Sequence, residues 1–269
     1  STAPYANKFI VNNSISNLRT NGLIYGFYNY YHNQSVVGYN TMLNDTVGST
    51  AYCYYTSSTG TNQLDFRNNS LKNFVQLSTT GIIYGLYQSG GTKIRIFNNN
   101  FDNITSYNTI NAGATMYGYY ITSSTNTEIF NNQISNLKAL TNGSSVNALY
   151  GMYFVGGSIF KVFHNTIYLA NTTSTGTNFG ATGLYYTNTI TGMDLRNNII
   201  NVDINPKGTG IVTALRSSGT PNNLVATSNA NVFYTPPGAN RFFYGEGITT
   251  ATALANTYSL TNDPNFNNA

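Results

Sequence analysis

Residues 128–134 read Glu-Ile-Phe-Asn-Asn-Gln-Ile, and the last three of them show a pattern that recurs through the chain: an asparagine, any residue, then an apolar residue. The pattern begins at Asn13, Asn40, Asn69, Asn99, Asn132, Asn165, Asn197 and Asn231. The spacings are 27, 29, 30, 33, 33, 32 and 34 residues. A period of this length predicts a protein built from stacked repeats, each forming one small structural unit.

Most repeats also carry an aromatic segment centred on glycine. Four copies read Tyr-Gly-x-Tyr, at 25–28, 84–87, 117–120 and 150–153. Asn, Thr, Gly and Tyr are poor helix formers, whereas Leu64-Asp65-Phe66 alternates apolar and polar residues as a half-buried strand does. The repeats therefore predict an all-β, single-stranded parallel β-helix (β-solenoid) of about seven to eight coils.

The combination of apolar-x-x-Asn-x-apolar, as at 129–134, with a following Gly-apolar segment, as at Gly151-Met152, resembles a known family. It is similar to the right-handed parallel β-helix of the pectin-lyase-like superfamily over roughly residues 8–235. The resemblance implies a right-handed coil, and it leaves function open because that superfamily includes enzymes, adhesins and phage fibres. We expect a lead-in at 1–7, β-helix repeats at 8–235 and a non-repeat capping segment at 236–269.

Composition excludes several classes of protein. Among 269 residues only 12 are Lys or Arg and 8 are Asp or Glu, and the bases are scattered rather than gathered into the stripe that nucleic-acid binding requires. No apolar run approaches the roughly 18 residues of a membrane helix. The single cysteine, Cys53, excludes an internal disulfide and a Cys-rich zinc site. We expect an extracellular or cell-surface protein that neither binds nucleic acid nor inserts into a membrane.

Four successive coils carry a charged residue four positions before the repeat asparagine: Asp65, Arg95, Glu128 and Lys161. Because stacked coils lie about 4.8 Å apart, these residues are predicted to form a ladder of alternating sign that fixes register through ion pairs. The alternative is a catalytic or metal site built on the two carboxylates. A carboxylate flanked by bases has a lowered pKa and is a poor general acid. The residues three positions before the repeat asparagine are predicted to face the core, and Asp194 falls at that position in its coil.

The resemblance implies two enzyme templates. Lyases of the family use a calcium-binding carboxylate cluster with an Arg or Lys base, and hydrolases use two or three Asp carboxylates in a cleft. The sequence contains no Asp-Asp and no Asp-x-Asp. We therefore expect no catalytic residue, no metal and no cofactor.

The repeat asparagines are predicted to stack as a structural side-chain ladder within turns, because Asn tolerates the left-handed backbone of a sharp turn. The members of this predicted ladder are Asn13, Asn40, Asn69, Asn99, Asn132, Asn165 and Asn197. Carbohydrate recognition by these amides is the alternative interpretation.

The aromatic segments predict an exposed strip of tyrosines. The two tyrosines of Tyr-Gly-x-Tyr are three residues apart, so regular strand alternation places them on opposite faces. If the variable third residue faces the core, the glycine and the second tyrosine face outward. The predicted outer strip comprises Tyr28, Tyr54 or Tyr55, Tyr87, Tyr120, Tyr153 and Tyr185. Such a strip could stack sugar rings, contact a partner protein, or simply stabilise its sheet.

Three functions follow from the sequence. The leading hypothesis is a non-catalytic structural or adhesive surface module, or a self-assembling fibre subunit, whose partners are copies of itself, head-to-tail or lateral, or a surface polysaccharide. The second is a carbohydrate-binding β-helix that uses the tyrosine strip. The third is a polysaccharide lyase or glycoside hydrolase, which requires a cluster of unpaired carboxylates.

Overall fold

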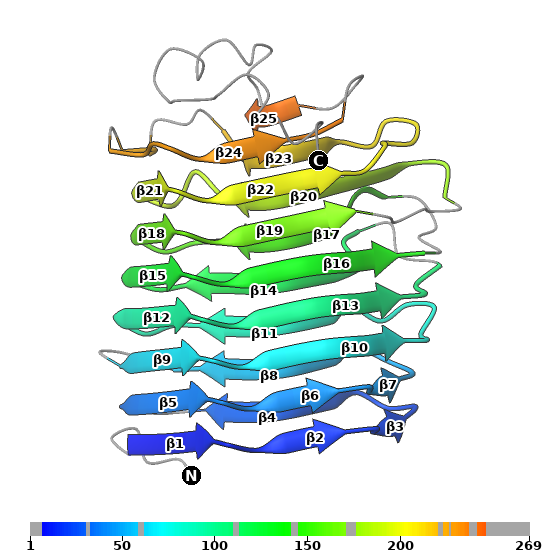
Figure 1. Cartoon of the computed structure of the whole chain (residues 1–269), viewed down its shortest axis with the longest axis vertical. Helices are drawn as coiled ribbons and strands as arrows, with labels where there is room; N and C mark the ends of the chain where they lie inside the picture. The colour runs from blue at the N-terminus through cyan, green and yellow to red at the C-terminus, as the bar shows by residue number, and fades with distance from the viewer. Residues whose placement is uncertain are drawn as a thin grey trace.

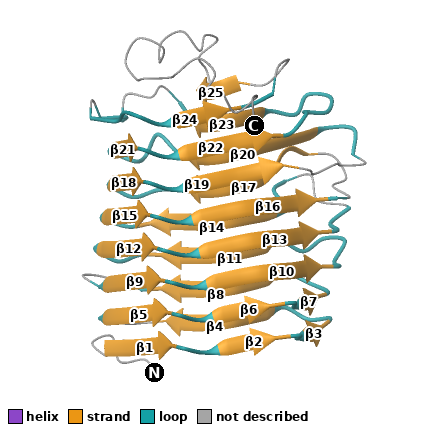
Figure 2. Ribbon diagram, in the orientation of Figure 1, coloured by secondary structure: helices purple, strands orange, loops and turns teal. Residues whose placement is uncertain are grey.

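A computed structural model describes residues 7–30, 33–58, 62–109, 113–140, 145–170, 176–219, 223–225, 227–236 and 241–245. Over these residues the chain winds into one parallel β-solenoid, and Figure 1 shows its right-handed coils stacked along a single axis. Every described element is a strand (Figure 2), so the predicted fold class is confirmed. The described residues include no helix capable of crossing a bilayer.

Each full coil contributes one strand to each of three parallel sheets. The first sheet contains β1 (Asn7–Val11), β5 (Gln34–Gly38), β9 (Gln63–Arg67), β12 (Lys93–Phe97), β15 (Asn126–Phe130), β18 (Ile159–Phe163) and β21 (Gly192–Arg196). The second contains β2 (Ser14–Ser16), β6 (Thr41–Leu43), β10 (Ser70–Gln76), β13 (Asn100–Ser106), β16 (Gln133–Ala139), β19 (Thr166–Ala170), β22 (Ile199–Asp203) and β24 (Val232–Tyr234), with the short β3 (Arg19–Thr20) and β7 (Thr46–Val47) alongside. The third contains β4 (Ile24–Tyr30), β8 (Ala51–Ser57), β11 (Ile83–Ser89), β14 (Met116–Ser123), β17 (Ser145–Phe154), β20 (Phe179–Tyr186), β23 (Val212–Ser217) and β25 (Arg241–Gly245).

The seven strands of the first sheet are joined by six full turns, slightly fewer than the seven to eight coils expected. Among the described residues, single parallel bridges from Met193 to Leu224 and from Arg196 to Asn229 follow β21 in the first sheet, whereas the other two sheets continue with full strands. Parallel pairing in the third sheet reaches β25, past residue 235, where the repeat was expected to end. Residues 246–269 of the expected cap and residues 1–6 of the expected lead-in lie outside the described residues.

Apolar side chains from all three sheets fill the interior of the coil. One column of the first sheet runs through Val37, Phe66, Ile96, Ile129, Val162 and Leu195, each at most 2% exposed. Since burying one such side chain stabilises a fold by about 1.5–3 kcal/mol, these columns are the main source of stability. The sequence predicts Ile10, Phe66, Ile96, Ile129 and Val162 for this column, three residues before the repeat asparagine. The last four are buried, and Ile10 is partly buried against the core.

The corner between the first and second sheets is built from two adjacent columns of residues. The first column adopts a left-handed backbone, with φ between 53° and 59°, at Asn12, Tyr39, Asn68, Asn98, Asn131, His164, Asn197 and Ala230. Asparagine adopts this conformation more readily than most residues, which explains its frequency here. His164 substitutes for asparagine at this corner, and His32 lies outside the described residues.

The second column is the asparagine ladder. Its members are Asn13, Asn40, Asn69, Asn99, Asn132, Asn165, Asn198 and Asn231. Each asparagine donates its backbone N–H and its Nδ2–H to the Oδ1 of the next, at 2.8–3.1 Å. From Asn40 onward, Nδ2 also donates to a backbone carbonyl of the preceding coil. The ladder thus satisfies buried backbone groups at every turn.

The predicted ladder contains one wrong member. Asn198, not Asn197, continues the hydrogen-bonded series, and Asn197 occupies the left-handed column before it. The sequence misleads here because two asparagines are followed by two isoleucines, so either asparagine satisfies the pattern. Burial separates them, since Ile199 is 38% exposed and Ile200 only 1%.

Correcting this register also moves Asp194. Asp194 lies opposite Lys161 in the parallel register of β18 and β21. It therefore belongs to the charged column and not to the core column. The core position of that coil is filled by Leu195.

Candidate functional site

The outer face of the third sheet is covered by two columns of tyrosines, which we call the tyrosine face. The first column contains Tyr25, Tyr52, Tyr84, Tyr117 and Tyr150, and the second contains Tyr28, Tyr55, Tyr87, Tyr120, Tyr153 and Tyr185. Within each column successive rings stack with centroids 4.6–5.5 Å apart and planes within 29° of parallel. The distance between neighbouring coils therefore sets the distance between the stacked rings.

The prediction that the two tyrosines of Tyr-Gly-x-Tyr face opposite sides is wrong. Tyr84 and Tyr87 make an edge-to-face contact at 5.7 Å on the same outer face, and Leu86 is fully buried. The glycine between them also faces inward, since a Cβ on Gly85 would lie 2.9 Å from the ring of Phe101. Two consecutive inward residues replace strict alternation. The first is glycine in most coils, and the small residues Cys53 and Ala214 fill the same buried position in β8 and β23.

The structure places the predicted strip in the second tyrosine column. Tyr28, Tyr87, Tyr120, Tyr153 and Tyr185 all belong to it, and exposure falls from 52% at Tyr28 to 7% at Tyr185. Tyr55 is the member from the second coil. Tyr54 is instead a fully buried core residue whose hydroxyl donates to the carbonyls of Asn40 and Ser70. The first column was not predicted, because regular strand alternation gives no sign that two consecutive residues point inward.

The stacking determines which atoms the tyrosine face offers to a partner. Ring faces are covered by the rings above and below, so only ring edges and hydroxyls can meet a partner. Burial is the larger cause, and the neighbouring tyrosines the smaller one, of a raised pKa at Tyr84 and Tyr117. Because this pKa lies above the ordinary phenol value, both hydroxyls stay protonated at neutral pH. Strands β4, β8, β11, β14 and β17 contain no charged residue. The face is aromatic, uncharged and rigid.

The outer face of the first sheet is different, because it carries the ion ladder. The register aligns Asp65, Arg95, Glu128 and Lys161 as predicted, and Asp194 extends the column. Arg95 donates two hydrogen bonds to Asp65, at 2.7 and 2.5 Å, and Lys161 lies 3.4 Å from Glu128.

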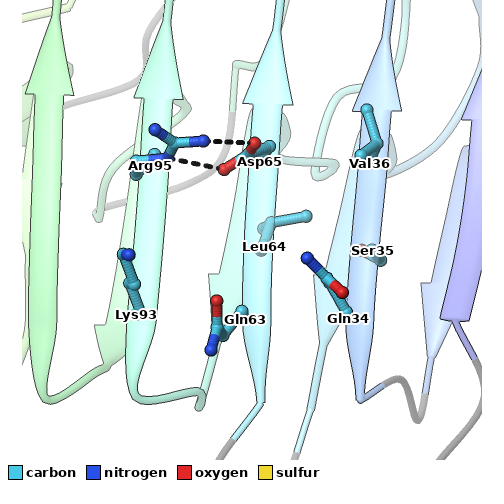
Figure 3. A pocket seen from close by; sticks show the side chains of 8 residues that line it. All are labelled: Gln34, Ser35, Val36, Gln63, Leu64, Asp65, Lys93 and Arg95. Atoms are coloured by element: carbon cyan, nitrogen blue, oxygen red, sulfur yellow. Dashed lines mark hydrogen bonds and ion pairs between the residues drawn. The ribbon is translucent and has the colours of Figure 1, made fainter.

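Two hollows lie on this sheet. Figure 3 shows the first, where Arg95 and Asp65 face each other across neighbouring strands near Lys93, Gln63 and Gln34. Its volume is about 50 Å³. The second, of about 310 Å³, lies over the Glu128–Lys161 pair. In each hollow the carboxylate is paired with a base.

No protein-family model, curated protein or solved structure matches this chain. The chemistry of the site therefore has to be read from its own residues. Within the described ranges, no three His, Cys, Asp or Glu side chains are grouped so that they could hold a metal ion.

The remaining carboxylates of the coil are dispersed. Asp102 lies opposite Lys72 in the register of β10 and β13, and it accepts hydrogen bonds from Ser135 Oγ at 2.7 Å and Asn136 Nδ2 at 2.8 Å. Asp194 forms a two-bond contact with Arg196 at 2.8 and 2.5 Å. Asp65, Glu128 and Asp194 are therefore held in ion pairs, whereas Asp102 is held by neutral side chains.

The ion ladder is expected to contribute little to stability. The side chains of Asp65 and Arg95 are 27% and 39% exposed. Ion pairs exposed to solvent contribute about 0.2–1 kcal/mol to the stability of a fold. Asp65→Asn is therefore expected to lower the free energy of unfolding by about 1 kcal/mol or less, with the difference shrinking in high salt. Urea unfolding at low and high ionic strength measures this. A loss several times larger would show that the pair does more than fix register.

Asp45 is a fully buried carboxyl in the second coil, and it predicts a pH dependence. It accepts a hydrogen bond from the backbone N–H of Leu18 at 2.8 Å, while its Oδ2 has no partner. Burial, more than its backbone hydrogen bonds can offset, raises the pKa of Asp45 above its ordinary value of 3.8. The folded state therefore favours the protonated acid. The contribution of Asp45 to stability is complete at a pH below its pKa in the unfolded chain. This contribution is lost as the pH rises through the raised pKa of the folded state.

Wild-type protein is accordingly expected to lose stability between pH 4 and pH 7 relative to Asp45→Asn, which has no charge to bury. Thermal unfolding of both proteins across that range measures the difference. Parallel curves for the two proteins would contradict a raised pKa at Asp45.

Proposed function

We propose that this chain is a non-catalytic structural or adhesive module of an extracellular surface protein, with the tyrosine face as its lateral contact surface. The observation that carries the proposal is the pair of stacked tyrosine columns, which run over five strands without a charged residue, β4, β8, β11, β14 and β17. Tyrosine is enriched at protein interfaces, and stacking fixes each ring before contact, so that little side-chain entropy is left to lose. The low charge of the sheet also removes repulsion between copies.

The coil architecture and the asparagine ladder support the further proposal that the chain is a divergent member of the pectin-lyase-like superfamily. Membership would not make it an enzyme, because that fold hosts many functions. The paired carboxylates argue against a lyase or hydrolase. Arg95 stands between Asp65 and Glu128 in the column, and Lys161 stands between Glu128 and Asp194. No two adjacent ladder positions are both acidic.

Carbohydrate binding is the second candidate, and one observation favours it. Tyr25 and Tyr28 lie in the first coil and are 44% and 52% exposed. Tyr28 also stacks on Tyr30 at 5.8 Å, so Tyr25 has the more open ring face on which a sugar could stack. Elsewhere in the columns only edges and hydroxyls are available. A glycan would therefore bind at the first coil rather than along the whole strip.

A set of variants tests the contact surface. Tyr87→Ser, Tyr120→Ser and Tyr153→Ser together are expected to abolish concentration-dependent association of the purified chain in sedimentation velocity. The matched control is Phe97→Ser with Phe130→Ser, which removes another stacked aromatic pair (centroids 4.8 Å apart) from the first sheet. The control should associate as the wild type does.

Two results would count against the proposal. Equal association by all three proteins would remove the tyrosine face as the contact surface. Loss of glycan binding in Tyr25→Ser with Tyr28→Ser, with no self-association in the wild type, would favour the carbohydrate-binding candidate.

A further inference from the structure

The N-terminal end of the coil leaves core side chains partly uncovered. Ile10, Ile15 and Ile24 begin three inward columns, and all three are only partly buried against the core. Their neighbours in the next coil, Val37, Met42 and Ala51, are at most 1% exposed. The first coil thus has the interior of a middle coil without a neighbour on one side.

The strand edges at this end are also free. Within the described residues, β1 pairs only with β5, β2 only with β6, and β4 only with β8. A parallel strand directs its backbone groups alternately to its two neighbours. About half of the N–H and C=O groups of β1, β2 and β4 therefore point away from the coil, and three open edges of this kind invite another strand.

The asparagine ladder gives this end a direction. Every later ladder Oδ1 accepts from the N–H and Nδ2–H of the preceding asparagine, as Asn40 accepts from Asn13. Asn13 is the first member described, and within the described residues no donor reaches its Oδ1. The missing donor would be an asparagine one coil earlier, in a strand running the same way.

The two tyrosine stacks end at the same coil. Tyr25 stacks on Tyr52 at 4.9 Å, and Tyr28 stacks both on Tyr55 of the next coil at 5.1 Å and on Tyr30 of its own strand at 5.8 Å. Tyr25 is 44% exposed, and a further coil could place a ring over its open face. The other end of the solenoid differs, because Phe233 and Asn231 are only 7% and 6% exposed.

We propose that the N-terminal end of this solenoid is a docking surface for one further parallel β-coil of the same repeat, with asparagine at the ladder position and aromatic residues at the two outer positions. Such a coil would pair with three edges at once, donate two hydrogen bonds to Asn13 Oδ1, and cover Ile10, Ile15 and Ile24. A single strand or a helix would satisfy only one of these three requirements. The inference does not depend on the lateral role of the tyrosine face.

The test supplies that coil directly. A copy of residues 34–62 is inserted before Asn7 in the full chain, which places Asn40, Tyr52 and Tyr55 of the copy one coil ahead of Asn13, Tyr25 and Tyr28. The control insert has the same length and carries Asn40→Ala, Tyr52→Ser and Tyr55→Ser. Amide hydrogen exchange in β1, β2 and β4 is then compared in the unextended and the two extended chains.

The unaltered insert is expected to slow exchange of the outward amides of these strands by about tenfold or more, because they leave solvent for a paired sheet. The control insert is expected to give markedly less protection. The proposal is overturned if exchange in the chain with the unaltered insert equals that in the unextended chain. It is equally overturned if both inserts protect to the same extent, since recognition would then not require the ladder and the stacks.

Discussion

Asn132→Ala is expected to lower the free energy of unfolding by about 4 kcal/mol, since each buried polar group left without a partner costs about 1–3 kcal/mol. The side chain is 2% exposed, and its Nδ2 donates to Ile96 O and Asn165 Oδ1, both at 2.8 Å. Its Oδ1 accepts from Asn99 N and from the hydroxyl of Tyr119, both at 3.1 Å. Alanine cannot replace any of these bonds, and no water can reach the site without opening a coil. Urea unfolding followed by circular dichroism measures the loss.

The control for this variant is an asparagine outside the ladder. Asn73 is exposed and has a left-handed backbone, with φ of 53°, and it shares side-chain hydrogen bonds with Asn44 and Asn103. Asn73→Gly keeps the backbone conformation, so we expect a loss of about 1 kcal/mol or less. Similar losses for the two variants would contradict the view that the inner ladder holds the coils together.

Gly151→Ala is the second change with a large expected effect. A Cβ at this position would lie 2.5 Å from the carbonyl oxygen of Gly183 and 2.6 Å from Cγ2 of Ile167. The first of these atoms is backbone of the next coil and cannot rotate away. Overpacking of a rigid core costs about 1–3 kcal/mol, occasionally more, and we expect the upper end of that range. The near-ultraviolet circular dichroism of the tyrosine stacks should weaken as well, because Tyr150 is adjacent in the chain.

Gly22→Ala provides the comparison, since the only atom within 4 Å of its added Cβ is Thr20 Oγ1 at 3.8 Å. We expect its unfolding midpoint and its tyrosine spectrum to match those of the wild type. A tolerant Gly151→Ala would contradict the view that the backbone of the next coil leaves no room for a Cβ at this position.

The sequence predicts the fold well because the asparagine repeat has a direct structural cause. One asparagine per coil must occupy the same corner for its amide to reach the next, so the pattern recurs at every turn, and the charged and apolar columns follow from alignment to it. Alignment fails only where the pattern is ambiguous. At Asn197-Asn198-Ile199-Ile200 two registers fit, and the error there displaced Asp194 as well.

The candidate site was less predictable because it depends on a backbone irregularity. Regular alternation would turn one tyrosine of each Tyr-Gly-x-Tyr inward, but the inward glycine lets both reach the outer face. Nothing in the sequence alone specifies that two consecutive residues point inward. Once both columns are known, the coil spacing explains why their rings stack and cover one another's faces. This stacking argues against the binding of sugar rings along the strip.

Electron microscopy of the purified, unliganded chain tests the central claim most directly. The account predicts particles joined side by side through the third sheet, and it predicts that they disperse when Tyr87, Tyr120 and Tyr153 are replaced by serine. Dispersed single particles of the unaltered chain at high concentration, or side-by-side assemblies that survive the serine variant, would contradict the claim that the tyrosine face is the contact surface.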